Sequence, residues 1–296
     1  MNAAVVHKQV EPIFIHTGQH YDYEMSQVFL EELNLPKIHH FLNVQSGTHG
    51  QQTGALLTSL ERILEKVKPD VVVVVGDTNT TLAGALAAAK LHIAIAHVEA
   101  GCRSFDYDMP EEINRLVVDS ISGIFFAPSE VTALNLLFEG KPADRIFLAG
   151  NTIVDIVEET QELRRAIQLD EELGEGAPVI VTLHRQENVD DKTRLKQLLT
   201  ALGRINAPII FPIHPRTKKR IAEFGLQKIV EKIPNLRLVK PLSYLTFMRL
   251  LEDALVVVTD SGGIQMEAII LGTPCVLARD TTELPETVWA EANHIT

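Results

Sequence analysis

The sequence predicts an α/β protein made of two Rossmann-like domains that face each other across a cleft. An unbroken run of five valines at residues 71–75 stops at Gly76-Asp77, and a second apolar run at 93–98 stops at Glu99. Residues 80–91 between them are rich in Ala and Leu at helical spacing, which predicts a strand, a helix and a strand. A crossover of this length makes the strands parallel, and continuous apolar runs suit strands buried on both faces. The alternation recurs along the chain, as in doubly wound folds.

In the first half of the chain, short apolar runs that end at turn-forming residues predict the strands, and helical spacing predicts the helices. Strands are expected at residues 12–16, 71–75, 93–98, 123–127 and 147–149. Helices are expected at 21–33, 53–68 and 80–91, from Pro110 onward, and at 154–168. The acidic, Gly-containing stretch 170–176 is the best candidate for a linker. An N-terminal domain is therefore expected at residues 1–165.

The alternation restarts after this stretch, so a C-terminal domain is expected at residues 176–296. Its strands are expected at 179–183, 209–213, 236–239, 255–259 and 274–277, and its helices at 192–205, 217–233, 244–251 and 263–271. Many strands of both domains end in polar or small residues. Turn chemistry explains any one of them. Their accumulation is the stronger signal, because open α/β sheets bind ligands at the carboxyl ends of their strands.

Composition excludes several classes of protein. The net charge of −12 argues against general nucleic-acid binding, which needs a basic face. No stretch reaches the roughly 20 apolar residues of a membrane helix, and residues 1–9 have no pattern of a secretory signal. Cys102 and Cys275 are too few for a disulfide framework or a zinc site, and no other spacing suggests a metal. We therefore expect a cytoplasmic protein without a metal cofactor.

Carboxylates in the first domain are candidates for proton transfer. Asp77 and Glu99 follow parallel strands and are expected to face one cleft, where paired carboxylates commonly move protons. Glu111 lies in the first turn of the helix that opens at Pro110. It joins them if its side chain projects into the cleft, although capping preferences explain an acid there equally well. Arg115, one turn further on, is placed to pair with Glu111 or with a phosphate.

Candidate nucleotide contacts lie in the second domain. Ser261, Gly262 and Gly263 precede or open a helix, where free backbone N–H groups attract an anion. The alternative is an ordinary N-cap by Ser261 with a tight turn. Glu267, about one turn in, can accept bonds from a ribose or is simply a surface residue. His184-Arg185 and His214-Pro215-Arg216 each join an imidazole to a guanidinium after a strand, which favours a ligand role for His184 and His214.

These segments together resemble the non-hydrolysing UDP-N-acetylglucosamine 2-epimerases. The resemblance covers residues 11–286 and is carried by an ordered set of motifs: Gly76-Asp77-Thr78-Asn79-Thr80, His97-Val98-Glu99-Ala100-Gly101, Pro110 to Arg115, Gly150-Asn151-Thr152, His184-Arg185 and Thr259-Asp260-Ser261-Gly262-Gly263-Ile264-Gln265. It implies the glycosyltransferase-B fold, a homodimer, and interconversion of UDP-GlcNAc and UDP-ManNAc without a metal or nicotinamide cofactor. In this family UDP is eliminated to leave a 2-acetamidoglucal and adds back after C2 is reprotonated.

The resemblance also implies roles for individual residues. Asp77, Glu99 and Glu111 match the family's catalytic carboxylates, and Arg115 matches a phosphate-side arginine. The positions that match UDP-binding residues are His184, Ser261, Gly262, Gly263 and Glu267, with Phe247 beside the uracil. Gln19 and His20 resemble a segment that in bacterial members helps to bind a second, activating UDP-GlcNAc.

The chain departs from the family pattern in three places. The family's first strand, ending in Gly-Thr-Arg-Pro-Glu, has no counterpart before residue 11, and the family's C-terminal helices are expected to be missing after Thr296. Leu284 replaces a nucleotide-contacting arginine, with Arg279 as a possible substitute. Four alternatives therefore stay open: an epimerase of 2,3-diacetamido uronic acid UDP-sugars, a hydrolysing epimerase, a glycosyltransferase of the same fold, and an inactive UDP-sugar-binding protein.

Overall fold

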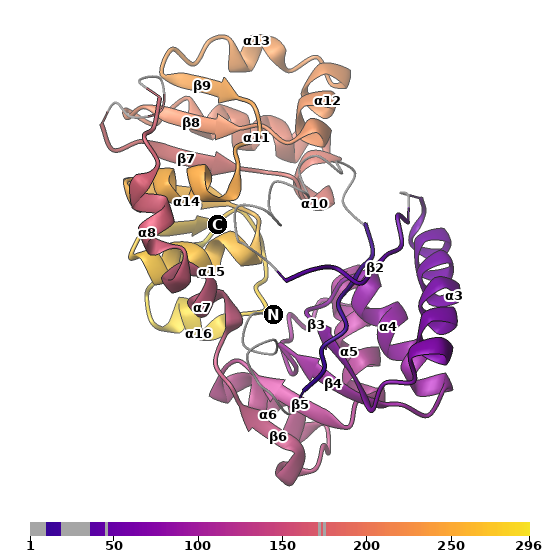
Figure 1. Cartoon of the computed structure of the whole chain (residues 1–296). Helices are drawn as coiled ribbons and strands as arrows, with labels where there is room; N and C mark the ends of the chain where they lie inside the picture. Colours follow the sequence, from indigo (N-terminus) through magenta and orange to yellow (C-terminus); the bar gives the residue numbers. More distant parts are fainter. Residues whose placement is uncertain (1–9, 19–35, 45–46, 171–172, 174–175) are drawn as a thin grey trace. The chain divides into compact units, whose positions relative to one another are not determined.

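The computed structural model describes residues 10–18, 36–44, 47–170, 173 and 176–296 of the chain. The chain divides into two compact units, Met1–Thr152 and Ile153–Thr296 (Figure 1). All strand pairs among the described residues are parallel, which confirms the predicted α/β class. The helix expected at 21–33, the pair Gln19-His20 and most of the expected linker lie outside the described residues.

The first unit is organised around the sheet β3-β4-β5-β6. Its strands are β3 (Val71–Val75), β4 (Ala94–Val98), β5 (Ile124–Ala127) and β6 (Ile146–Leu148), all close to the predicted positions. A separate parallel pair joins β1 (Ile15–His16) to β2 (His40–Phe41). The sequence did not predict β2, because two residues are too short to show an alternating pattern.

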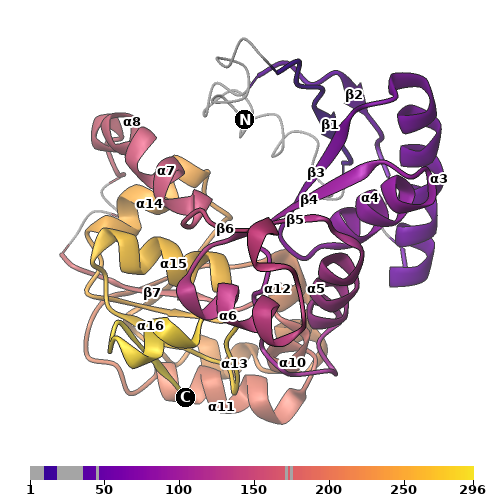
Figure 2. The same cartoon turned by 90° about the horizontal axis from the view of Figure 1, so that it is seen from below.

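Small side chains let the helices of this unit pack closely. They are α3 (His49–Val67), α4 (Asn79–Lys90), α5 (Pro110–Ile121) and α6 (Glu130–Phe138), with a 3-10 turn at Ala143–Arg145. Helix α4 presents four fully buried alanines, at positions 83, 85, 87 and 88, and packs with both α3 and α5 (Figure 2). Helix α3 begins four residues before the predicted start, because Thr48 and Gln51 form a capping box.

The second unit contains the six-stranded sheet β12-β11-β10-β7-β8-β9. Five of its strands were predicted: β7 (Val179–Thr182), β8 (Ile209–Pro212), β9 (Leu236–Val239), β10 (Val256–Thr259) and β11 (Cys275–Leu277). The sixth, β12 (Asn293–Ile295), was not. Helices α11 (Lys192–Leu202), α14 (Tyr244–Glu252) and α15 (Gly262–Leu271) confirm three predicted helices, and α10 (Gln186–Val189) and α16 (Pro285–Trp289) are additional short ones.

Two predicted helices are each divided in the structure. Residues 154–168 form α7 (Thr152–Glu159) and α8 (Gln161–Ala166), with Thr160 between them outside helical geometry. Residues 217–233 form α12 (Pro215–Glu223) and α13 (Gln227–Val230), separated at Gly225, whose φ is +68°. Apolar spacing continues through both breaks, so the sequence pattern did not reveal them.

Helices α7 and α8, which the sequence grouped with the first domain, pack with the second unit. Val157 of α7 is buried in the apolar cluster that contains Met248 and Leu251 of α14. Arg164 of α8 is 2% exposed, donates to the Val157 carbonyl and Thr160 Oγ1, and lies 4.0 Å from Glu252 of α14. Figures 1 and 2 both show α8 beside α14. Buried contacts therefore set the division between Thr152 and Ile153, before the acidic stretch.

Candidate active site

The first unit brings Asp77 and Glu99 to one edge of its sheet. Strands β3 and β4 are parallel neighbours, with Val75 opposite Val98, so the two acids follow adjacent strand ends. Glu99 Oε2 lies 3.6 Å from the point where a Cβ on Gly76 would stand, which places its carboxylate beside the turn that carries Asp77. This confirms the predicted proximity of the pair.

Arg115 holds the Asp77 side chain in place. Its Nε and Nη2 donate to Asp77 Oδ2 at 3.0 and 2.5 Å, while its Nη1 donates to Glu112 Oε2 at 2.8 Å. Arg115 is only 2% exposed and Glu112 1%, so the bond between them is shielded from water, whereas the Asp77 side chain is 31% exposed. The sequence offered Glu111 or a phosphate as partners of Arg115; the structure shows Asp77 and Glu112.

Glu99 lies in a tight turn with an unusual backbone. Its φ is +69°, a left-handed conformation that a residue with a side chain seldom adopts. Such strain is common at functional sites, where the surrounding structure holds it. The turn ends at Gly101, where a Cβ would stand 2.1 Å from the Thr132 carbonyl oxygen, so only glycine fits.

Glu111 and Glu112 differ in their surroundings, although both lie in the first turn of α5. The Glu112 carboxylate accepts from Ser104 N, Ser104 Oγ and Phe105 N, so it fixes the loop before the helix. Glu111 is half-buried, and its part in proton transfer stays a prediction. Asn114, on the same helix, donates to the Asp77 carbonyl at 2.8 Å.

A buried ionic cluster that the sequence did not single out lies beneath both turns. Asp119 of α5 is fully buried and binds His97 at 2.6 Å and Arg103 at 2.7 Å. Burial alone raises the pKa of the Asp119 carboxyl, but the hydrogen bonds and charges of His97 and Arg103 outweigh it and leave the pKa below its usual value. Asp119 is thus an ionised carboxylate in the interior.

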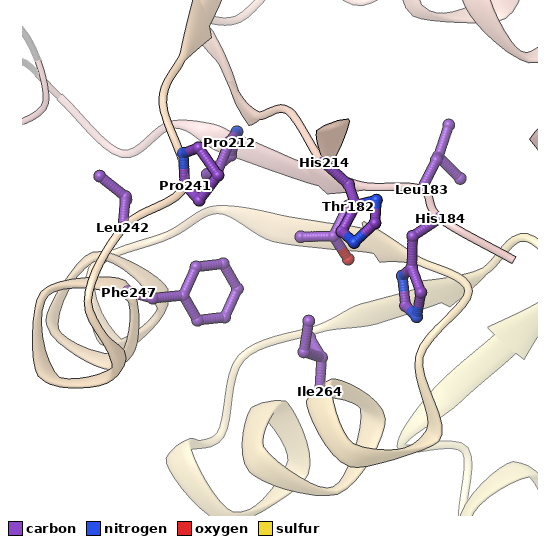
Figure 3. A pocket seen from close by; sticks show the side chains of 9 residues that line it. All are labelled: Thr182, Leu183, His184, Pro212, His214, Pro241, Leu242, Phe247 and Ile264. Carbon is purple, nitrogen blue, oxygen red and sulfur yellow. The ribbon is translucent and has the colours of Figure 1, made fainter. Parts of the chain in front are cut away.

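The second unit contains a pocket of about 180 Å³ at the carboxyl ends of β7 and β8. Figure 3 shows Phe247 of α14 and Ile264 of α15 pointing toward the strand-end residues His184 and His214. The two imidazole rings lie 5.8 Å apart. The remaining lining residues are Thr182, Leu183, Pro212, Pro241 and Leu242. An apolar slot edged by two imidazoles suits a flat, partly polar ring.

Asp260 fixes the His184 side of this pocket. It is fully buried, and its carboxylate accepts from the backbone N–H groups of His184 and Arg185 and from Asn188 Nδ2, all at 3.0–3.1 Å. His184 Nδ1 also lies 3.1 Å from Asp260 Oδ1. Burial by itself raises the pKa of Asp260. The hydrogen bonds from these donors and the charge of His184 lower it by more, so the pKa lies below its usual value. The sequence named Asp260 within the motif that precedes the helix, but gave it no role of its own.

The start of α15 shows the N-cap that the sequence gave as one of two alternatives, and its role as a phosphate site stays a prediction. Ser261 is the N-cap and accepts from Ile264 N at 3.4 Å, which confirms the predicted ordinary N-cap. The chain's own anion also stands beside this backbone: Glu283 Oε1 lies 2.1 Å from where a Cβ on Gly262 would stand. A carboxylate thus lies against the helix start, where the macrodipole favours negative charge.

Leu284, which replaces an arginine of the family pattern, is buried. Arg279, the possible substitute for that arginine, is buried as well. Arg279 is 2% exposed and donates to Glu283 Oε2 at 2.8 Å; its Nη2 is buried without a hydrogen-bond partner within the described part of the chain. Leu284 is 6% exposed and precedes α16 as its N-cap. Arg279 therefore reaches the start of α15 through Glu283.

Glu267 interacts with Tyr244 in a largely buried setting. Burial raises the pKa of Glu267 to about 7, against a hydrogen bond with Tyr244 that lowers it. Burial and the Glu267 charge raise the pKa of Tyr244 well above its usual range.

Arg216, which follows His214 at the pocket, is bound to Asp190, with its Nη2 2.5 Å from Asp190 Oδ2.

Neither a metal cluster nor a membrane helix is found where the structure describes the chain. The described residues contain no group of three or more His, Cys, Asp or Glu side chains able to hold a metal ion. No helix among them is long and apolar enough to span a bilayer.

Comparison with known proteins gives the family. The family model for UDP-N-acetylglucosamine 2-epimerase matches residues 3–296. A UDP-N-acetylglucosamine 2-epimerase of Methanocaldococcus jannaschii is 50% identical over 293 residues, which span 94% of this chain and 79% of that protein. A UDP-2,3-diacetamido-2,3-dideoxy-D-glucuronate 2-epimerase of Pseudomonas aeruginosa is 44% identical over 300 residues, 99% of this chain and 82% of that protein.

Solved structures agree with this assignment. The crystal structure of the M. jannaschii enzyme in complex with UDP-GlcNAc and UDP superposes with a TM-score of 0.92 at 47% identity, and covers 99% of this chain and 83% of that one. The S. aureus MnaA–UDP co-structure gives a TM-score of 0.89 at 32% identity, with 99% and 78% covered. The fold of this chain is therefore the two-domain glycosyltransferase-B type, and the chain belongs to the UDP-N-acetylglucosamine 2-epimerase family.

Proposed function

We propose that this chain interconverts UDP-GlcNAc and UDP-ManNAc by inverting C2 of the sugar. The observation that carries the proposal is the placement of Asp77 and Glu99 at adjacent strand ends, in a chain of this family. Asp77 is held by Arg115, and Glu99 is held in a left-handed turn. Carboxylates fixed in this way can remove a proton from one face of a carbon and return one to the other.

The chemistry follows from the family's reaction. One carboxylate removes the C2 proton as the bond between C1 and the UDP oxygen breaks, which leaves a 2-acetamidoglucal and UDP. Reprotonation of C2 on the opposite face and return of the UDP oxygen to C1 give the epimer. Asp77, Glu99 and Glu111 are the candidates for the proton steps. Arg115 orients the Asp77 carboxylate for these steps through its two hydrogen bonds to Oδ2.

The nucleotide is assigned to the second unit. The pocket edged by Phe247, His184 and His214 suits the uracil ring. The start of α15, with Ser261, Gly262 and Gly263, is assigned to the diphosphate, because the macrodipole favours an anion there and the Glu283 carboxylate already lies against it. Glu267, one turn into α15, is proposed to accept from the ribose hydroxyls.

The proposal is tested by running the reaction in deuterium oxide with the intact chain and UDP-GlcNAc. We expect UDP-ManNAc with deuterium at C2, and a loss of at least about 100-fold in kcat for Asp77→Asn. Asp144→Asn, an exposed acid of the same unit, is the matched control and should keep full activity. UDP-ManNAc that carries no deuterium at C2 would contradict the mechanism.

A second substrate is favoured by one observation. The P. aeruginosa relative, whose name gives a 2,3-diacetamido glucuronate sugar, covers 99% of this chain at 44% identity. Both sugar nucleotides should therefore be assayed in parallel, and the larger kcat/KM identifies the substrate. Free ManNAc as the product would indicate a hydrolysing epimerase. Sugar transfer to an acceptor would indicate a glycosyltransferase, and UDP binding without turnover an inactive binding protein.

The resemblance also supports a homodimer, and the composition supports a cytoplasmic location; we propose both. Regulation by a second UDP-GlcNAc through Gln19 and His20 is proposed on the resemblance as well, and is tested by whether added UDP-GlcNAc accelerates the reverse reaction.

A further inference from the structure

One buried carboxylate, Asp119 of α5, is linked to both turns that carry the paired acids, directly to the turn of Glu99 and through His97 to the turn of Asp77. Asp119 Oδ1 lies 2.6 Å from His97 Nδ1, and Asp119 Oδ2 accepts from Gly101 N at 3.0 Å and from Arg103 Nη2 at 2.7 Å. Asp119 and His97 are fully buried. Neither residue belongs to the acid pair or to the nucleotide pocket described above.

The first connection runs through His97 to the turn that carries Asp77. His97 Nε2 lies 2.9 Å from the Gly76 carbonyl oxygen. A carbonyl oxygen can only accept, so Nε2 donates, and Nδ1 faces the Asp119 carboxylate as a second donor. The residue immediately before Asp77 is thereby tied to α5. Asn114 of the same helix ties down the Asp77 carbonyl at 2.8 Å.

The second connection runs directly to the turn that carries Glu99. Asp119 Oδ2 accepts the N–H of Gly101, two residues after Glu99. Gly101 has no room for a side chain, and Asn135 donates to its carbonyl at 2.9 Å, so this end of the turn is fixed on several sides. The left-handed φ of Glu99 lies within the segment that Asp119 anchors.

The rest of the cluster makes this arrangement stable in the interior. Arg103 supplies a buried positive charge to Asp119, donates to the Cys102 carbonyl and binds both oxygens of Glu139 at 2.7 Å. A buried carboxylate that is fully paired and hydrogen-bonded can stay ionised, whereas removal of a partner leaves an uncompensated buried charge, which is strongly destabilising. Glu139 is the outer end of the cluster, with its side chain 31% exposed.

We infer that Asp119 is the positioning residue that sets the spacing of Asp77 and Glu99. The inference rests on the proposed function for its catalytic consequence, but the geometry it describes can be measured without turnover. Asp119 acts on one turn through His97 and on the other through Gly101 N–H. Because a misplacement of about 1 Å can lower a rate by about 100-fold, loss of this anchor should affect chemistry far more than nucleotide binding.

The experiment combines hydrogen–deuterium exchange with steady-state kinetics on the intact chain. Asp119→Ala should speed amide exchange in both segments, 76–79 and 98–103. It should lower kcat for UDP-GlcNAc about 100-fold while KM changes less than about threefold. Asp119→Asn should restore slow exchange and kcat to within about tenfold. Its oxygen can accept from Gly101 N–H and Arg103, and its amide can donate to a neutral His97.

Two more variants make the result specific. His97→Gln leaves the bonds of Asp119 to Gly101 and Arg103 in place, so it should speed exchange only in 76–79. It supplies the test if Asp119→Ala does not fold. Asp144→Asn alters an exposed acid outside the cluster and should leave both segments and kcat unchanged.

The outcomes separate the two proposals. Unchanged exchange in both segments of Asp119→Ala, or in 76–79 of a folded His97→Gln, overturns the positioning role. If the unaltered chain does not epimerise UDP-GlcNAc while exchange responds as expected, the proposed function fails and the structural role of Asp119 stands.

Discussion

At the scale of single residues, the environment of each buried acid decides its protonation. Asp119 and Asp260 are both fully buried, and donors around each hold the pKa below the usual value. Glu267 is also largely buried, and its hydrogen bond is with the Tyr244 hydroxyl. The effect of burial exceeds the effect of this bond, so the pKa of Glu267 rises to about 7. The three acids therefore differ because Asp119 and Asp260 receive several donors and positive charges, whereas Glu267 receives one hydroxyl.

Glu267 should make the stability of the chain depend on pH. The folded chain holds its proton up to about pH 7, whereas the unfolded chain releases it near 4.5, so the folded state binds more protons between these values. The free energy of unfolding contributed by this group is therefore fully present below pH 4.5 and is lost as pH rises through 7. The total is about 3 kcal/mol.

Denaturant unfolding at pH 5 and pH 8 measures this effect. Glu267→Gln cannot ionise, so the stability difference between this variant and the unaltered chain should shift toward the variant at pH 8. An identical difference at the two pH values would show that Glu267 titrates normally.

At the scale of elements, close approaches of backbone fix the turns at the ends of strands. Gly101 combines a φ of +80° with a Cβ position 2.1 Å from the Thr132 carbonyl oxygen of α6. Gly140 has almost the same φ, +79°, but nothing lies within 4 Å of its Cβ position. The two glycines therefore separate the effect of backbone conformation from the effect of packing.

Gly101→Ala should destabilise the chain by about 3 kcal/mol, since overpacking adds to the strain of a left-handed alanine. Gly140→Ala should lower stability by only about 1 kcal/mol, from conformation alone. Thermal or denaturant unfolding of both variants gives the comparison. Equal losses would mean that α6 moves away from the Glu99 turn without resistance.

The pocket between the ends of β7 and β8 and helices α14 and α15 depends on Phe247 for its aromatic surface. Phe247→Ala should weaken UDP binding by about 1–3 kcal/mol, that is about 5- to 150-fold in Kd, because stacking on a base is lost. Phe138→Ala removes a ring that is 87% exposed on α6 of the first unit and serves as the control. Calorimetric titration with UDP measures the Kd of both variants. Equal Kd values for the two variants would contradict the assignment of Phe247 to the nucleotide site.

At the scale of the whole molecule, the proposed chemistry is divided between two units. Unit Met1–Thr152 contains Asp77, Glu99 and the cluster of Asp119, while unit Ile153–Thr296 contains the pocket and the start of α15. Each unit has its own parallel sheet and its own apolar core. Nucleotide binding and proton transfer can therefore be probed separately in the intact chain.

UDP without a sugar should protect mainly the second unit. At about 100 times its Kd, a ligand that binds only the folded state adds about 2.7 kcal/mol of stability. Hydrogen–deuterium exchange of the intact chain with and without UDP should show slower exchange at 182–184, 212–214, 241–247 and 261–267. Residues 76–79 should change less. Protection confined to the first unit would contradict the assignment of the nucleotide.

The sequence alone determined the local order of the fold and the composition of the site. Valine runs such as 71–75 identified strands, and the turn residues after them identified Asp77, Glu99 and His184, because hydrophobic periodicity and turn chemistry are local properties. It failed at the breaks at Thr160 and Gly225, where apolar spacing runs on through a change of direction. It also extended the first domain past Thr152, since packing of Val157 and Arg164 is not a local property.

Only the tertiary structure decided which charges are buried and what they hold. Asp119 reaches His97 and Arg103 across 22 and 16 residues, and Asp260 reaches His184 across 76. In the sequence each is one more acid in a chain of net charge −12. Asp77 and Glu99 could be named from the ends of two strands. The contacts that fix their positions come from a helix that folds back beneath both turns, and burial makes those contacts strong.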